Sequence, residues 1–406
     1  MNIKKEQMMD AKLLAFKAKP KSVTGLVDGK FSADGAREEY QNHFKRPEDR
    51  LCVTLDQIPD FKITGSPQKL SGGLLNFVWR LNGTIGSVPH TLIVKSAPPY
   101  IASSPEVYLD PDRIFFEARM LEAFSTGGIL EAIGSEKVRP PRLILLDRKR
   151  HLLVMEDVCQ CPDLEAWLKE SHSTTEAADI GRSLGKFIGT LHRFSAQRPQ
   201  MADEFNNQSM QQTRLAVLYG NVHNYALRAH LPDAEQLGKL AVEYGELLQQ
   251  PGKALIMGDL WLPSVMVSTH GLRVIDWELA HYGRPSQDVG HFAAHLWMHI
   301  HRANTPGAAK NAETILEKFL VSYRLALGTD FDEILGAAGV MESAIHFGSE
   351  ILARTVGLFQ QGYLYQGLSS DHPFVQQAAQ TAANHVLDPQ AVNTFDALGW
   401  RSTKGR

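Results

Sequence analysis

Two aspartates that each follow a short apolar run are the residues of this chain best placed to do chemistry. Asp259 follows the run at 255–257, and Asp276 follows the run at 274–275. Apolar runs bounded by turn residues are typical of buried strands, so each aspartate is expected near a strand end. The residues at 265–274 predict a β-hairpin that would bring both carboxylates to one site. Phosphoryl transfer needs this arrangement, with one carboxylate facing the attacking hydroxyl and another holding Mg²⁺ on the phosphates.

Each acidic residue of this region has its own expected role. Asp259 is the candidate catalytic base: a carboxylate with a pKa of about 4 is a weak base, but it can orient a hydroxyl and accept its proton late. Asp276 is the candidate principal magnesium ligand, because Mg²⁺ prefers hard carboxylate oxygens. Ser264 and Glu278 are candidate further ligands, and Glu278, two residues after Asp276, is expected on the same face of a strand. A purely structural role stays open, more so for Glu278 than for the aspartates.

An ordered set of residues earlier in the chain has the types that hold a nucleoside triphosphate. Adjacent glycines at 72–73 join two predicted strands and let backbone N–H groups approach an anion. Lys95 ends the next predicted strand and Glu117 lies on the following predicted helix, the order in which kinases place a phosphate-binding lysine and its orienting glutamate. Alone, the glycines are more often a hairpin turn and the lysine an exposed strand end. The candidate nucleotide-binding residues are Ser71, Gly72, Gly73, Asn76, Lys95, Glu117 and, in the segment leading to the helices, Glu156 and Val158, whose main chain could face adenine.

The predicted elements change in kind near residue 158. Strands with a single helix at 114–124 come before it, and helical periodicity dominates after it, so the chain is predicted to be of the α+β class. We expect an extension that is partly helical at 1–60, a nucleotide-binding sheet lobe at 61–158 and a helical lobe with the catalytic hairpin at 159–406. The helices predicted in the second lobe lie at 180–194 (capped by Thr174 or Thr175), 205–250 (broken near Gly220), 308–326, 332–362 and 373–387.

Composition limits the class of protein. Of the 406 residues, 43% are hydrophobic and 21% charged, which is ordinary for a soluble globular chain. The net charge of −3 shows no nucleic-acid footprint, and neither a signal peptide nor a run of about twenty apolar residues is found. Three cysteines argue against a disulfide framework and for a reducing compartment. We therefore expect a cytoplasmic protein that binds neither nucleic acid nor membrane.

Three histidines at helical spacing raise the question of a metal site. His291, His295 and His299 share one face of a predicted helix, but no third type of zinc ligand lies nearby in the sequence. They are therefore predicted to be partly buried polar residues and not ligands. Asp288, at the start of this helix, is predicted to cap it and to brace the Asp259 loop.

The motifs at 70–81, 92–101, 152–158, 257–267 and 275–292 resemble those of the aminoglycoside phosphotransferase/choline kinase superfamily of small-molecule kinases. Within it, the chain looks most like the methylthioribose-kinase-like branch and the fungal 4-hydroxytryptamine kinases. The resemblance implies a two-lobed protein-kinase-like fold, a small N-terminal sheet lobe and a larger, mainly helical lobe.

By motif, the resemblance also assigns roles to single residues. It makes Asp259 the catalytic aspartate and Asp276 the metal aspartate, with Glu278 completing an Asp-x-Glu motif. Lys95 and Glu117 become the phosphate-anchoring pair, and ATP and Mg²⁺ the cofactors. Two positions depart from the wider superfamily: Met257 stands in place of its usual histidine, and Ser264 in place of its metal-binding asparagine.

The expected activity is ATP-dependent transfer of the γ-phosphate to a hydroxyl of a small metabolite. By resemblance, a hydroxylated aromatic amine such as a hydroxytryptamine is the first acceptor and a methylthioribose-like sugar the second. The alternative is a nucleotide-binding pseudokinase that acts as an interaction module, which Met257 and Ser264 favour. A protein kinase is not expected, because too few residues separate Asp276 from Asp288 for a long activation loop. The kinase interpretation requires Lys95, Asp259 and Asp276 to converge on one cleft; the sequence determines neither the acceptor nor the oligomeric state.

Overall fold

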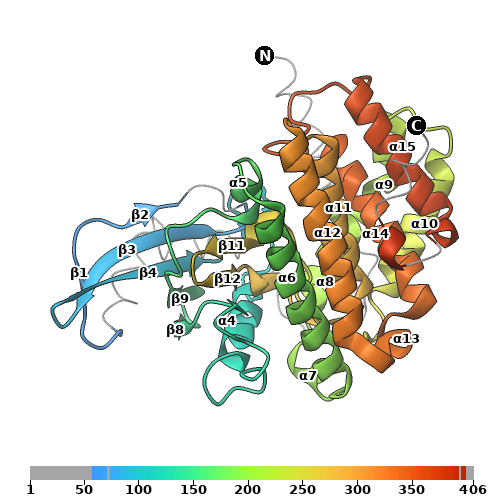
Figure 1. Cartoon of the computed structure of the whole chain (residues 1–406). Coiled ribbons are helices and arrows are strands. Elements are labelled where there is room, and N and C mark those ends of the chain that lie inside the picture. Colours follow the sequence, from blue (N-terminus) through green and yellow to red (C-terminus); the bar gives the residue numbers. More distant parts are fainter. Residues whose placement is uncertain (1–56, 71–73, 393–394, 399–406) are drawn as a thin grey trace, which may run out of the picture. The chain divides into compact units, whose positions relative to one another are not determined.

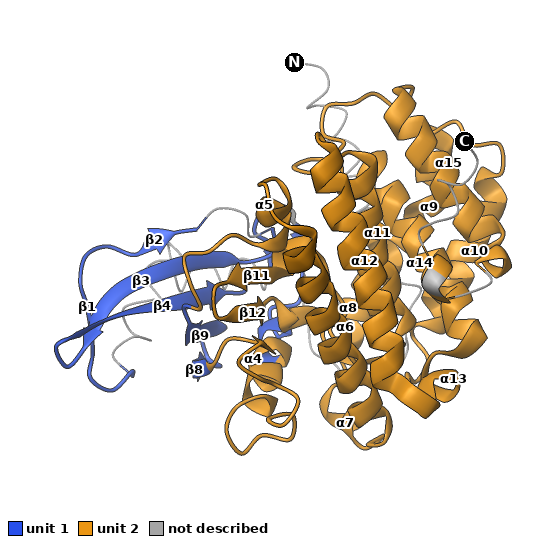
Figure 2. Ribbon diagram, viewed as in Figure 1, with its two compact units in different colours: residues 1–115, 143–157 blue, residues 116–142, 158–406 orange. Residues whose placement is uncertain are grey.

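The computed structural model describes residues 57–70, 74–392 and 395–398 (Figure 1). The predicted glycine turn Ser71-Gly72-Gly73 and most of the expected extension at 1–60 therefore lie outside the described residues. The chain forms two compact units, the first made of 1–115 with 143–157 and the second of 116–142 with 158–406 (Figure 2). Strands dominate the first and helices the second, so the predicted α+β class is confirmed. Lys95 belongs to the first unit and Asp259 to the second, so their convergence on one nucleotide stays a prediction.

The first unit is built on one antiparallel sheet. Its strands are β1 (Phe61–Ile63), β2 (Gln68–Lys69), β3 (Phe77–Ile85), β4 (Val88–Ser96), β8 (Leu143–Asp147) and β9 (Leu152–Glu156), with a separate short hairpin of β5 (Tyr100–Ile101) and β6 (Ser104–Tyr108). The order is β1-β3-β4-β9-β8, and β2 pairs with β3. Because side chains alternate along a strand, Trp79 with Leu81 and Leu92 with Val94 lie on one buried face and form much of the core. The predicted hairpin at 143–155 is confirmed as β8 and β9.

A helix with a buried arginine follows the first strands. Helix α4 (Arg113–Ala123) begins in the first unit and ends in the second. Arg113 is 1% exposed, and its guanidinium donates to the carbonyls of Leu75, Pro98 and Asp110. It also donates to Oδ1 of Asn76 at 2.9 Å. One side chain therefore holds together the loops of this unit that border the β3–β4 pair.

Helices make up most of the second unit. The α-helices are α5 (Leu164–Leu168), α6 (Thr174–Ala196), α7 (Met201–Glu204), α8 (Gln208–Val217), α9 (Val222–Arg228), α10 (Ala234–Leu247), α11 (Ser286–His301), α12 (Pro306–Leu327), α13 (Phe331–Ile334), α14 (Gly336–Thr355) and α15 (Pro373–Leu387). Short strands accompany them: β7 (Val138–Arg139), β10 (Ala254–Ile256), β11 (Val265–Ser268), β12 (Gly271–Val274) and β13 (His281–Gly283). Single 3₁₀ turns complete the described chain: η1 (Tyr219–Asn221), η2 (Leu262–Ser264), η3 (Trp277–Leu279), η4 (Gly328–Asp330), η5 (Pro389–Ala391) and η6 (Phe395–Ala397).

A stripe of glycines lets α6 lie directly against α12. Gly181, Gly185 and Gly189 are spaced at i, i+4 and i+8 along one face of α6. A Cβ at Gly185 would lie 2.2 Å from the carbonyl oxygen of Phe319, and a Cβ at Gly181 would lie 2.4 Å from that of Ile315. No side chain fits there, so the two backbones approach closely and form a rigid pair.

Two predicted helix boundaries are wrong. The cap of α6 is Ser173, whose hydroxyl accepts from the backbone of Glu176 in a reciprocal capping box. The helix predicted at 332–362 is interrupted at Gly336, which adopts φ +60°, and ends at Thr355. Beyond that end, Gly362 and Gly367 also have positive φ, a conformation that cannot continue a right-handed helix.

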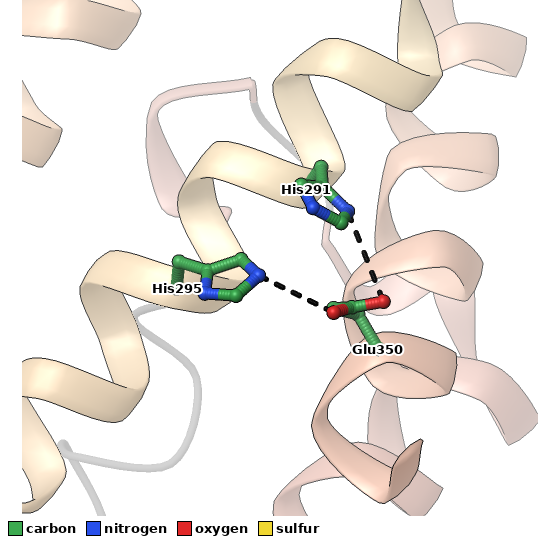
Figure 3. A group of neighbouring side chains, drawn as sticks. All are labelled: His291, His295 and Glu350. Carbon is green, nitrogen blue, oxygen red and sulfur yellow. Dashed lines mark hydrogen bonds and ion pairs between the residues drawn. The ribbon is translucent and has the colours of Figure 1, made fainter. Parts of the chain in front are cut away.

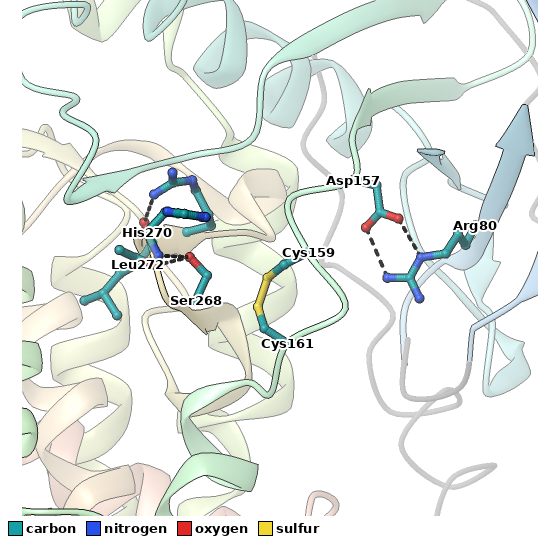
Figure 4. The surroundings of a disulfide bond; sticks show 9 residues. Arg80, Asp157, Cys159, Cys161, Ser268, His270 and Leu272 are labelled. Carbon is teal, nitrogen blue, oxygen red and sulfur yellow. Dashed lines mark hydrogen bonds and ion pairs between the residues drawn. A yellow bond between two sulfur atoms is a disulfide. The ribbon is translucent and has the colours of Figure 1, made fainter. Parts of the chain in front are cut away.

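Two of the three cysteines are joined. Cys159 and Cys161 form a disulfide immediately after the segment that leads into the helical unit, with Cα atoms 5.2 Å apart (Figure 4). One bond between cysteines two residues apart is not the disulfide framework that the sequence argued against, and Cys52 lies outside the described residues. The crosslink closes a very short loop, which removes little conformational entropy from the unfolded chain. Among the described residues no helix combines the length and the apolar character that a membrane span requires.

Candidate active site

Asp259 lies on a sharp turn that begins where a buried strand ends. Strand β10 pairs with β13 antiparallel, with Ile256 opposite His281. After it, Gly258 adopts φ +80°, and a Cβ there would lie 2.4 Å from the carbonyl oxygen of Leu279. Only glycine fits this close approach in a left-handed conformation. Gly258 therefore makes the sharp turn that sets the direction of the chain at Asp259.

Asp288 on α11 braces this turn. Its side chain is fully buried, Oδ2 accepts the N–H of Met257 at 2.8 Å, and Oδ1 accepts that of Gly258 at 2.7 Å. Nε2 of His192, on α6, lies 3.2 Å from Oδ2 of Asp288, so this buried carboxylate has a polar neighbour besides the two backbone groups. The predicted bracing role is confirmed. The capping role is wrong, because α11 begins after Pro285 and Asp288 lies within its first turn.

Charged and polar groups surround the carboxylate of Asp259. Arg214 of α8 donates from Nη2 to Oδ1 at 2.9 Å, and Nε2 of His291 lies 3.4 Å from the same oxygen. Burial raises the pKa of Asp259 to about 6, against the opposing effect of Arg214 and Arg354. The side chain is still 24% exposed. A reachable carboxylate with a pKa nearer neutrality is a better general base than an ordinary one.

Asp276 follows the predicted hairpin, which is confirmed as β11 paired antiparallel with β12. The residue adopts φ 66° and ψ 55°, the left-handed conformation that aspartate tolerates better than most side chains, and precedes η3. Its negative charge contributes to the raised pKa of Asp259. The half-buried Asp276 therefore lies within electrostatic reach of the candidate base.

The other two candidate metal ligands have different surroundings from those predicted. Glu278 does not share a strand face with Asp276, because the left-handed turn at Asp276 ends the extended chain and places Glu278 in η3, 5% exposed. Ser264 is fully buried, and its Oγ donates to the carbonyl of Trp261 at 2.8 Å and accepts the Trp261 N–H at 3.3 Å. The hydroxyl thus closes the loop after Asp259. Metal binding by either residue stays a prediction.

The candidate nucleotide residues of the sheet are mostly buried. Lys95 is 5% exposed on β4, between Val78 of β3 and Leu153 of β9. Asn76 is 4% exposed and its amide oxygen accepts from Arg113, so this side chain supports the loop. Glu117, on α4, is 1% exposed.

The segment around Glu156 and Val158 is fixed by an ion pair. Glu156 ends β9 opposite Leu92. Asp157 accepts from Arg80 of β3 through two bonds, at 2.6 Å to Nε and 3.1 Å to Nη2 (Figure 4). Such a bidentate pair fixes the direction of the main chain. Val158 comes next and is the first residue of the longer segment of the second unit, 158–406.

Sequence reasoning missed two residues of the site. Arg214 precedes Asp259 by 45 positions and belongs to no motif. His291 was predicted only as a buried polar residue, yet it faces Asp259. In the sequence, Arg214 appears only as one charged residue on a mostly polar helix. That pattern does not distinguish an active-site arginine from one in contact with solvent.

Comparison with known proteins identifies the family. Residues 67–319, more than half of the chain, match the model of the phosphotransferase enzyme family. The chain belongs to this family.

The proteins that this chain resembles share less than a third of its residues in the aligned regions. A 4-hydroxytryptamine kinase of Psilocybe cyanescens is 28% identical over 237 residues, which cover 55% of this chain and 65% of that protein. A methylthioribose kinase of Exiguobacterium sibiricum is 23% identical, over 72% of this chain and 79% of its own length. Among solved structures, a putative aminoglycoside phosphotransferase from Ralstonia eutropha is 15% identical with a TM-score of 0.48, over 88% of this chain and 98% of its own.

Proposed function

We propose that this chain is an ATP-dependent kinase that transfers the γ-phosphate to a hydroxyl of a small molecule. The environment of Asp259 carries the proposal. A buried carboxylate on α11 holds the Asp259 turn through two backbone hydrogen bonds, and burial brings the pKa of Asp259 to about 6. In phosphoryl transfer the protein acts mainly by positioning and electrostatics, and an aspartate that orients the hydroxyl is its recurring part.

The acceptor hydroxyl would donate its hydrogen bond to Asp259 and pass its proton there as its oxygen bonds to the γ-phosphorus and the bond from that phosphorus to the leaving ADP breaks. Arg214 already donates to Oδ1 of the same carboxylate, which leaves Oδ2 for the acceptor. Asp288 keeps this oxygen in place through the Met257 and Gly258 backbone. The base therefore needs little rearrangement when the acceptor arrives.

A magnesium ion bound with ATP would neutralise charge on the phosphates. The donor set fits this role, since Asp276 offers a hard, half-buried carboxylate beside the candidate base. Glu278 would add a second carboxylate. Ser264 fits less well, because its Oγ donates to the carbonyl of Trp261.

The first unit would bind the nucleotide. Lys95 would hold the α- and β-phosphates with Glu117 orienting it, which agrees with the burial of both side chains, since lysine and glutamate are almost never buried unpaired. The backbone of the Ser71-Gly72-Gly73 turn would contact the phosphates. The main chain of Glu156 and Val158, fixed by the Arg80–Asp157 pair, would face the adenine.

A hydroxylated aromatic amine is the first acceptor that we propose, and a methylthioribose-like sugar the second. Relatives named 4-hydroxytryptamine kinase and methylthioribose kinase support this order. Trp261, half-buried and two residues from Asp259, could stack on an aromatic ring, as could Tyr363, whose ring centroid lies 6.5 Å away.

The test measures ADP release with ATP, Mg²⁺ and a panel of hydroxyindoles, thio-sugars and amino alcohols. Wild type should turn over at least one acceptor, and Asp259→Asn should lose 10²-fold or more in kcat, on the order of the contribution of a positioned base. The matched control is Asp233→Asn, an exposed aspartate before α10. Equal turnover by wild type and Asp259→Asn would remove the base assignment. Calorimetric binding of ATP and Mg²⁺ without transfer to any acceptor would favour the pseudokinase alternative.

A further inference from the structure

Helices α11 and α14 pack closely at a point where both carry possible metal ligands. A Cβ at Gly290 would lie 2.5 Å from the carbonyl oxygen of Ser343, so the two backbones nearly touch. His291 and His295 lie one turn apart on α11, and His346 and Glu350 lie one turn apart on α14. Figure 3 shows both α11 histidines directed at the carboxylate of Glu350. Three donor side chains, those of His291, His295 and Glu350, thus come from two facing helix turns, with ligand atoms within 4.8 Å of one another.

The separations between these donor atoms fit one small ion. Nδ1 of His291 lies 3.0 Å from Nε2 of His346 and 3.8 Å from Oε2 of Glu350, and Nε2 of His295 lies 3.2 Å from Oε1 of Glu350. Zinc bonds to nitrogen and oxygen are about 2.0–2.1 Å long, so tetrahedral geometry puts ligand atoms about 3.4 Å apart. The two distances to Glu350 lie within half an ångström of that value.

The second nitrogen of each imidazole faces an oxygen. Nδ1 of His295 lies 2.6 Å from the Tyr363 hydroxyl, and Nδ1 of His346 lies 2.6 Å from the Tyr219 hydroxyl. Nε2 of His291 lies 3.4 Å from Oδ1 of Asp259. Histidines that bind metals almost always donate their other N–H to an oxygen in this way, which fixes the ring and its tautomer.

Burial also suits a bound cation. Each of the three donor residues is at most 2% exposed, so water does not compete for them. The imidazoles are neutral donors, and Glu350, whose Oε1 also accepts from Arg354 at 2.6 Å, supplies the negative charge of the set.

We propose that His291, His295 and Glu350 bind one divalent transition metal, with Zn²⁺ favoured by two imidazole nitrogens and one carboxylate. His346 orients the His291 ring, and the metal is separate from the magnesium of phosphoryl transfer. It locks α11 to α14 and orients His291 against Asp259. The prediction that these histidines are not ligands overlooked Glu350, which lies 55 positions from His295.

The experiment uses the full chain without a polyhistidine tag. After treatment with a chelator, Co²⁺ is titrated in the absence of ATP, and zinc in the untreated protein is measured by mass spectrometry. We expect about one equivalent of metal, with the intense visible absorption of four-coordinate cobalt, displaced by Zn²⁺. His295→Gln and Glu350→Gln should weaken binding at least tenfold, whereas His299→Gln, also buried on α11 but outside the donor set, should not.

Two results would overturn the site. One is wild type that binds no cobalt or zinc, in which case the imidazoles form only a chain of hydrogen bonds. The other is unchanged affinity for the metal in a folded His295→Gln variant. The titration of wild type with cobalt shows whether the protein binds a metal even if a variant fails to fold. The kinase proposal is tested separately, because Asp259→Asn should keep its metal and lose transfer.

Discussion

Arg214 donates a hydrogen bond of 2.9 Å to Oδ1 of Asp259, so a guanidinium from helix α8 holds the candidate base, which lies on the turn after β10. Nη1 of the same arginine is buried and has no hydrogen-bond partner among the described residues. An arginine in this position both orients the carboxylate and favours its charged form. Arg214 therefore affects the pH at which the base works.

Activity should fall on the acid side in wild type. Burial raises the pKa of Asp259 to about 6, and a base must be deprotonated to accept a proton. The rate should be constant above this pKa and fall about tenfold per pH unit below it. In Arg214→Gln the pKa of Asp259 should rise further, because the positive charge that lowers it is gone. The dependence of kcat/KM on pH from 5 to 9 measures the pKa of the base in wild type and in Arg214→Gln. The control is Arg182→Gln, because Arg182 is exposed. If activity in Arg214→Gln fell at the same pH as in wild type, Arg214 would not control the pKa of Asp259.

Asp288→Asn should disturb the Asp259 turn. The amide can accept only through its oxygen, so one of the two N–H groups, of Met257 or Gly258, loses its acceptor in a buried place. The loss of hydrogen bonds to a charged group predicts a fall in the free energy of unfolding of about 1.5–3 kcal/mol. Urea unfolding measures this change, and kcat should fall while the KM for ATP is kept. Wild-type stability in the variant would show that the brace is dispensable.

Lys95→Met should weaken nucleotide binding. The variant removes the proposed contact to the α- and β-phosphates and keeps the apolar stem of a side chain that is 5% exposed. The Kd for ATP, measured by calorimetry, should rise at least tenfold. Lys62→Met on β1 of the same sheet is the matched control, because Lys62 is exposed. Equal affinities in the two variants would place the triphosphate elsewhere.

Gly185→Ala should separate α6 from α12. The added Cβ would lie 2.2 Å from the Phe319 carbonyl oxygen, and neither backbone can move without disturbing its helix. Overpacking of this kind costs about 1–3 kcal/mol. Thermal unfolding should show the lower stability, whereas Lys186→Ala, exposed on the same helix, should leave the melting temperature nearly unchanged.

Buried His299 should make the fold sensitive to acid. Burial lowers its pKa from 6.5 to about 3. A group whose pKa is lowered on folding keeps its full contribution above its unfolded pKa, so stability should decline as the pH falls from 6.5 toward 3. The free energy of unfolding at pH 7.5 and 5 measures the decline, which should be smaller in His299→Gln. An identical decline in both proteins would assign the acid sensitivity to other groups.

Local patterns predicted the elements that carry the site. The apolar runs before Asp259 and Asp276 and the turn at 268–271 indicated the strands correctly, because burial and turn chemistry act over a few residues. The apolar spacing of α6 and the first and last residues of α15 were also predicted correctly, because they too depend on short stretches of sequence. Helix 332–362 was overextended, since apolar spacing continues past glycines whose positive φ only the folded chain reveals.

The amino-acid sequence by itself determined which residues have the chemistry for phosphoryl transfer and where the chain changes from strand to helix. The tertiary structure decided which distant residues meet. Arg214 reaches the Asp259 turn from α8, Asp288 and His291 reach it from α11, and Glu350 reaches His295 across the contact of α11 with α14. Contacts of this kind depend on helix packing over tens of residues, and no short-range periodicity records them.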